Sequence, residues 1–162
     1  MSLINVIIEA VSTLAGNVPV YHYTKKDMGD LFVLRPKDSV KHRQSFSAND
    51  YKHSNFPRVF FYTDLNKTEH QVRTRFLYNG TVDGSKILNL QIAIQEYNAD
   101  SEQYKLVSPT AYKVVHALLG SGRPNYDSMF KFAAKNYDGI FYTTGGIPMI
   151  VYFKDIELTR SV

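Results

Sequence analysis

The chain has 162 residues, 44% of them hydrophobic and 21% charged, and carries a formal net charge of +4. This length and composition predict one globular domain with a substantial core. Cysteine is absent, which excludes disulfides, thiolate metal ligands and a cysteine nucleophile. No stretch approaches the roughly 18 apolar residues of a membrane span. Because residues 1–10 also lack the basic start of a secretory signal, we expect neither secretion by a signal peptide nor a membrane partner.

The first element expected is an amphipathic helix over residues 1–16. Its apolar side chains recur with helical spacing, and Gly16 followed by Asn17 is typical of a helix end. Two roles stay open for this helix. It either packs on a domain formed by residues 17–162, or it is a detachable targeting segment.

Residues 18–24 predict the first strand, because they are rich in β-branched and aromatic side chains. Strand alternation would place His22 and Thr24 on one face, with Tyr21 and Tyr23 on the other. His22 then has two interpretations. It is either a half-buried imidazole that bonds a neighbouring backbone group, or a ligand contact.

The next elements are a strand over residues 31–34 and a polar loop over residues 37–56 with one helical turn near residues 49–53. A loop of this length is typical of a binding or lid segment. Residues 57–64 (PRVFFYTD) form the strongest strand signal, and we predict that this strand is central. Asn66 is expected to cap a short helix that contains Glu69. A strand over residues 73–82 follows, with a turn signal at Asn79 and Gly80.

Two helices and a hairpin are the main elements predicted in the C-terminal half. A short apolar run covers residues 87–90, and residues 95–107 are expected to be exposed loop or helix. Ser108 and Pro109 favour the start of a helix that runs to about residue 119, and a second helix covers residues 126–136. A hairpin follows, with strands over 140–143 and 149–153 and a turn at residues 144–146. The tail, residues 154–162, is expected to be short and polar. This order predicts an α+β fold with a mostly antiparallel sheet.

The common catalytic motifs are absent. The sequence has no GxxxxGK[ST] or GxGxxG phosphate loop, no HExxH and no GxSxG, and its five histidines have no metal-site spacing. We therefore expect no metal site. Between Arg35 and Arg75, nine lysines and arginines stand against four acidic residues. This excess suits an anionic partner such as nucleic acid, and it equally suits a solvated surface loop.

Three segments, in their order and spacing, resemble a known family. They are Tyr21-His22-Tyr23-Thr24, then residues 57–64, then residues 136–141 (NYDGIF) followed by residues 150–156 (IVYFKDI). Together they resemble the ADP-ribosyltransferase-like domains of bacteriophages and mobile elements, in the histidine-containing branch found in polyvalent phage proteins. The resemblance spans residues 18–157. It implies small, mostly antiparallel sheets that form a cleft for NAD and are flanked by helices.

The resemblance also implies roles for individual residues. His22 would contact the adenosine ribose and help to seat the nicotinamide, with Tyr23 and Thr24 beside it and Tyr62 as an aromatic wall. The family's chemistry displaces nicotinamide through an oxocarbenium-like state, which a carboxylate stabilises. The candidates for this carboxylate are Glu157 and Glu69, although neither stands at a position that matches the family.

Three functions follow as hypotheses. The first is a phage-encoded ADP-ribosyltransferase that uses NAD to modify a host protein or nucleic acid in the host cytoplasm. The second is a catalytically inactive viral protein of the same fold, packaged in the virion against capsid or DNA. It is motivated by the basic charge and by the tetrapeptide Ile7-Ile8-Glu9-Ala10, which resembles the sites where prohead proteases of tailed phages cut, here after Glu9. The third is a basic nucleic-acid-binding module that uses aromatic residues within the basic segment, namely Tyr51, Phe56, Phe60 and Tyr62.

Overall fold

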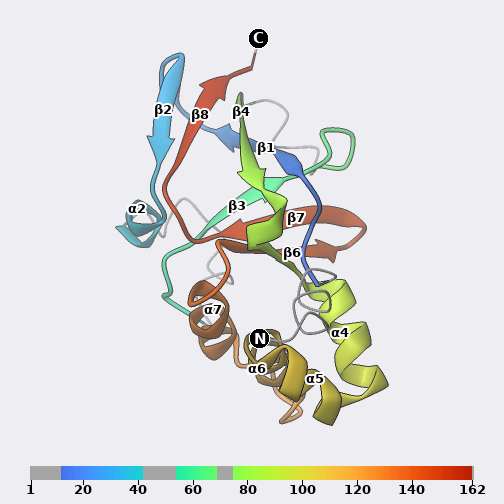
Figure 1. Cartoon of the computed structure of the whole chain (residues 1–162). Helices are drawn as coiled ribbons and strands as arrows, with labels where there is room; N and C mark the ends of the chain where they lie inside the picture. The colour runs from blue at the N-terminus through green and yellow to red at the C-terminus, as the bar shows by residue number, and fades with distance from the viewer. Residues whose placement is uncertain (1–11, 42–53, 69–74, 162) are drawn as a thin grey trace.

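The computed structural model describes residues 12–41, 54–68 and 75–161 (Figure 1). In chain order these residues form β1 (Asn17–Thr24), β2 (Leu31–Leu34), α2 (Pro36–Lys41), β3 (Val59–Tyr62), β4 (Phe76–Asp83), the 3-10 turn η3 (Gly84–Lys86), β5 (Ile87–Asn89), α4 (Leu90–Ala99), α5 (Ser101–Val107), α6 (Pro109–Leu119), α7 (Tyr126–Ala134), β6 (Gly139–Thr144), β7 (Ile147–Tyr152) and β8 (Ile156–Arg160). None of the described helices is long and apolar enough to cross a membrane.

The strands make one eight-stranded sheet in the order β2-β8-β4-β1-β3-β7-β6-β5. All neighbours are antiparallel except the parallel pair β5 and β6. The predicted α+β class with a mostly antiparallel sheet is therefore confirmed. The expected small separate sheets are instead two halves of one sheet, joined where Tyr21 of β1 lies opposite Tyr62 of β3. Figure 1 shows β2, β8 and β4 running steeply across the direction of β3 and β7, as a strongly twisted sheet does.

Two cores lie on opposite faces of this sheet. Helices α4, α6 and α7 cover the half formed by β3, β7, β6 and β5 (Figure 1). Leu88, Ile140 and Val151 are buried in the core between these helices and the sheet. The second core lies on the other face, where the twisted sheet folds over itself around Phe61 and Leu158. Successive residues of β3 serve different cores, because Phe61 enters the second while Phe60 packs against the first. We call the face of the second core the inner face and the opposite one the outer face.

The helices over residues 108–119 and 126–136 are confirmed as α6 and α7, and their first turns show why they start where they do. Pro109 is the first residue of α6, where a missing amide hydrogen costs nothing. The Asn125 side chain accepts a hydrogen bond from the Ser128 amide at 3.1 Å and so caps α7. Residues 95–107, predicted as loop or helix, belong to α4 and α5. The hairpin is confirmed as β6 and β7, with Gly145 and Gly146 at positive φ in its turn.

Several predictions about the ends of elements were wrong. Residues 154–162 are no polar tail, because β8 inserts between β2 and β4 and buries Ile156 and Leu158. Gly80 is not at a turn but inside β4. A Cβ there would lie 2.7 Å from Leu158 Cδ2, so the glycine permits the close approach of β8. The loop predicted over residues 37–56 begins as helix α2, and the rest of its described part, residues 54–56, has no regular secondary structure. The turn predicted near residues 49–53 lies outside the described residues.

The N-terminal helix was predicted over residues 1–16, of which 1–11 lie outside the described residues. The remainder is not helical. Thr13 forms a bridge to Leu88, and the Asn89 amide donates to the Ser12 carbonyl at 2.7 Å. This end of the predicted helix was wrong because the free edge of β5 offers these residues a partner for their backbone groups. The helix predicted after Asn66, with Glu69, also lies largely outside the described residues.

Candidate functional site

His22 lies where β1 and β3 separate, on the inner face of the sheet. Its Nδ1 is 3.0 Å from the carbonyl oxygen of Phe60. Its ring packs edge-on against Phe61, with 5.6 Å between the ring centroids. Because a carbonyl can only accept, Nδ1 carries the proton and Nε2 is left as the acceptor when the ring is neutral. The prediction that His22 bonds a neighbouring backbone group is confirmed.

Burial lowers the pKa of His22 below its usual value near 6.5, and the hydrogen bond to the Phe60 carbonyl opposes that effect without overcoming it. The imidazole is therefore neutral at pH 7. In this state the side chain satisfies a backbone carbonyl at the junction of the two sheet halves. It can also offer Nε2 to a hydroxyl of a ligand.

The residues predicted to surround His22 divide between the two faces. Thr24 shares the inner face by alternation, but its hydroxyl donates to the Lys26 carbonyl at 2.6 Å. Tyr23 and Tyr62 lie on the outer face, where their rings meet edge-to-face at 6.2 Å. The structure therefore pairs Tyr23 with Tyr62 and places neither on the face of His22.

The structure does not bring Glu157 to His22. Pairing across the sheet puts His22 in one row with Tyr78 and Arg160, while Glu157 lies three residues along β8 from that row. Two strand spacings and three residues along β8 give about 14 Å between the two Cα atoms. Glu157 is also exposed on the outer face, opposite Val33. Glu69, the other candidate, lies outside the described residues.

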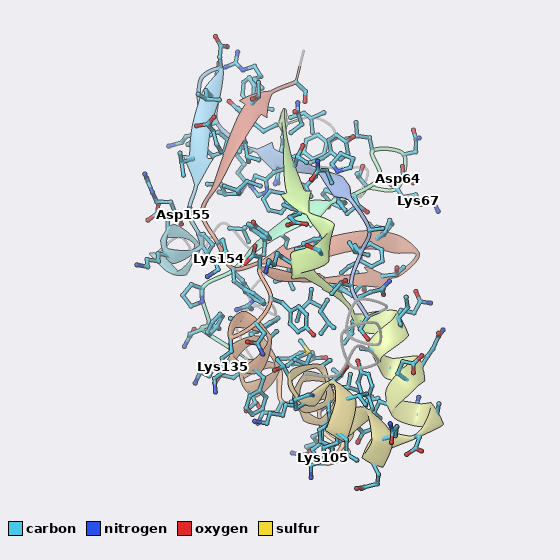
Figure 2. The ribbon with its side chains drawn as sticks, viewed as in Figure 1. Asp64, Lys67, Lys105, Lys135, Lys154 and Asp155 are labelled. Atoms are coloured by element: carbon cyan, nitrogen blue, oxygen red, sulfur yellow. The ribbon has the colours of Figure 1, made fainter. Side chains whose placement is uncertain are left out.

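Part of the basic segment is not at the surface. Arg58 is 2% exposed, and the rings of Phe56 and Phe60 pack against the core beneath the helices. Both rings are partly buried and contribute to that core. Tyr51 lies outside the described residues. Two lysines from outside the basic segment, Lys105 and Lys135, lie on the outside of the helical layer (Figure 2).

One concave site in the described structure was not suggested by the sequence. A cavity of about 470 Å³ lies between the helices and the sheet. Sheet residues form one side of it, and residues of α4, α6 and α7 form the other. Its lining is mostly apolar, with one buried cation and a few hydroxyl groups, and consists of Arg58, Phe60, Leu90, Leu118, Tyr126, Met129, Phe130, Ile140, Tyr142, Thr143, Thr144 and Val151.

Arg58 is held firmly at the wall of this cavity. Its Nη1 donates to the carbonyl oxygens of Ser54 at 3.1 Å and Phe56 at 2.9 Å. Its guanidinium lies over the ring of Phe130, 4.7 Å from the centroid, which is a favourable cation–π distance. The only hint in the sequence is an arginine at the start of the most apolar strand, and its neighbour Phe130 is too distant in the chain to be predicted.

Comparisons with protein-family models, with curated proteins and with solved structures give no significant match to this chain. Within the described part of the chain, no three histidine or acidic side chains gather as they would around a metal ion. Two places in the described structure are candidates for function, the junction at His22 and the cavity beside Arg58.

Proposed function

We propose that this protein is an ADP-ribosyltransferase-like protein that binds NAD at the junction of the two sheet halves. The observation that supports it best is the placement of His22. Its imidazole is fixed through Nδ1 by the Phe60 carbonyl where β1 and β3 part, and burial lowers its pKa. An imidazole in this state has Nε2 available as an acceptor for a ribose hydroxyl, which is the role that the resemblance implies.

The position of Glu157 favours the form of this proposal in which the protein binds NAD without transferring ADP-ribose. A carboxylate stabilises an oxocarbenium-like centre only at close range. Glu157 is instead on the opposite face of the sheet from His22 and about 14 Å away along the strand pairing. By the same resemblance we place the protein in a phage, with a host macromolecule as acceptor in the active form and the virion as location in the inactive form.

Calorimetric titration of NAD into the wild-type protein and into His22→Asn tests the binding. The asparagine amide can still donate to the Phe60 carbonyl, but it does not reproduce Nε2. We expect the wild type to bind NAD and the variant to bind about 3- to 10-fold more weakly, the usual effect of losing one neutral hydrogen bond. Circular dichroism of both proteins checks that they fold alike. A wild-type protein that does not bind NAD at millimolar concentration would refute the proposal.

A transfer assay separates the two forms. Labelled NAD is incubated with host lysate and either the wild type or Glu157→Gln. We expect no label on macromolecules with either protein. Transfer by the wild type that disappears in Glu157→Gln would show instead that Glu157 reaches the reacting centre.

A further inference from the structure

We propose that the cavity between the helices and the sheet binds a small organic anion, with an aromatic or aliphatic body and one carboxylate or phosphate group. This site goes beyond the proposed NAD site and is separate from it. His22 packs against Phe61 on the inner face of β3, whereas the cavity lies on the outer face, beside Phe60 and under α6 and α7. The two sites can therefore be tested independently.

The body of the ligand is specified by the cavity walls. Phe60, Leu118, Met129 and Ile140 line it from both the sheet and the helices. These side chains favour an apolar group, because burying it removes apolar surface from water on both sides. A volume of about 470 Å³ falls within the usual range of small-molecule sites, roughly 300–1,000 Å³.

The anionic group is specified by Arg58. A guanidinium keeps its charge at every physiological pH and matches the geometry of carboxylates and phosphates. Arg58 is 2% exposed, and two backbone carbonyls and the Phe130 ring already fix its position. Little side-chain entropy remains to be lost when an anion arrives, which favours binding by preorganisation.

The acidic side chain described near Arg58 is Asp127, whose pKa responds to the charge of Arg58. Asp127 shares this region, but its carboxylate bonds Lys131 at 2.7 Å and the Ser54 hydroxyl at 2.8 Å. The hydrogen bonds from Lys131 and Ser54 lower the pKa of Asp127, and the charges of Lys131 and Arg58 contribute in the same direction. With its carboxylate engaged in this way, Asp127 does not occupy the cavity, and the buried guanidinium that lines it favours an anionic ligand over a cationic one.

The cavity also has a polar end open to solvent. Thr143 and Thr144, at the end of β6, line it and are exposed, whereas Arg58 is buried. A ligand can therefore enter beside the β6–β7 hairpin and bring its anionic group to Arg58 while its body lies against Leu118 and Met129.

Matched probes test the ligand class by calorimetry: 4-phenylbutyrate, its neutral analogue 4-phenylbutanol, phenyl phosphate and inorganic phosphate. We expect 4-phenylbutyrate to bind at least about tenfold more tightly than 4-phenylbutanol, because only the acid makes a charge-assisted hydrogen bond with Arg58. Inorganic phosphate, which has no apolar body, should bind more weakly than phenyl phosphate. The tighter of the two aryl anions identifies carboxylate or phosphate as the preferred group.

Two tryptophan variants locate the binding. Leu118→Trp fills the cavity, whereas Leu119→Trp alters the next residue of α6, whose side chain is 43% exposed. We expect Leu118→Trp to abolish binding of the aryl anions and Leu119→Trp to preserve it, with both variants folded by circular dichroism. If Arg58→Met folds, it should bind the acid no better than the alcohol. If it does not fold, the comparison of Leu118→Trp with Leu119→Trp still tests whether the anions bind in the cavity. Saturating NAD and His22→Asn should leave this binding unchanged.

Equal affinity for the acid and the alcohol, binding that survives Leu118→Trp, or no binding of any probe at millimolar concentration would each overturn the proposal. None of these results depends on whether NAD binds, so a failure here and a failure of the proposed NAD site remain distinguishable.

Discussion

Replacing His22 tests its contribution to stability separately from its proposed contact with a ligand. In His22→Leu the ring is exchanged for an apolar side chain, and the Phe60 carbonyl loses the donor that lies 3.0 Å away. Leaving a buried acceptor without a partner costs about 1–3 kcal/mol. Because this hydrogen bond is only partly buried, we expect the lower half of that range, about 1–2 kcal/mol. For a chain of this length that loss lowers the melting temperature by about 2–8 °C. His22→Asn, which keeps a donor, should lose less.

The same variants predict a pH dependence. The pKa of His22 is lower in the folded protein than its unfolded value near 6.5. As the pH falls below 6.5, the unfolded chain binds a proton before the folded chain does, so the free energy of unfolding decreases. This contribution is fully present above pH 6.5 and is lost as the pH falls toward the folded pKa. His22→Asn has no such group, so its stability relative to wild type should improve between pH 8 and pH 5.

Urea unfolding followed by circular dichroism at several pH values between 8 and 5 measures both effects. The difference between wild type and His22→Asn cancels the titration of the other groups, which the two proteins share. If His22→Leu is as stable as the wild type, His22 is not the partner of the Phe60 carbonyl. If the difference between wild type and His22→Asn does not change with pH, His22 is not a buried neutral imidazole.

Three further predictions test the fold around the sites. Gly139→Ala would place a Cβ 2.5 Å from the Val151 carbonyl oxygen, so we expect a loss of about 1–3 kcal/mol in urea unfolding; an unchanged midpoint would contradict the tight pairing of β6 with β7. Leu158→Ala should cost about 2–5 kcal/mol because the side chain is fully buried, while the adjacent, exposed Thr159→Ala should change stability by less than about 0.5 kcal/mol. Equal effects would mean that β8 is not part of the core. Burial and, less strongly, the charges of nearby carboxylates raise the pKa of Tyr152 to about 12. Ultraviolet titration should therefore show a tyrosine ionisation near pH 12 that is missing in Tyr152→Phe, and an unaltered curve would refute this assignment.

The two candidate sites differ in how much of them could be predicted. Alternation along residues 18–24 correctly separated His22 from Tyr23, because the direction of successive side chains is a local property of a strand. The partner of His22 could not be predicted, since the Phe60 carbonyl reaches it only through the pairing of two strands. For the Arg58 cavity, the only signal in the sequence was an arginine at the start of an apolar strand. The cavity exists because Arg58 and Phe130, far apart in the chain, meet when α7 packs on the sheet.

By itself, the sequence determined the elements whose signals are local. These are the strands around His22 and Phe60, the helices begun by Pro109 and Asn125, and the hairpin turned by two glycines, and they rest on side-chain shape and backbone freedom within a few residues. Only the tertiary structure decided that residues 156–160 are a buried strand, that Gly80 faces Leu158, and that Ser12 and Thr13 pair with the edge of β5. In each of these cases the stabilising partner is another strand. A short segment with weak propensity takes the conformation that satisfies its backbone against that neighbour, and the identity of the neighbour is a property of the whole fold.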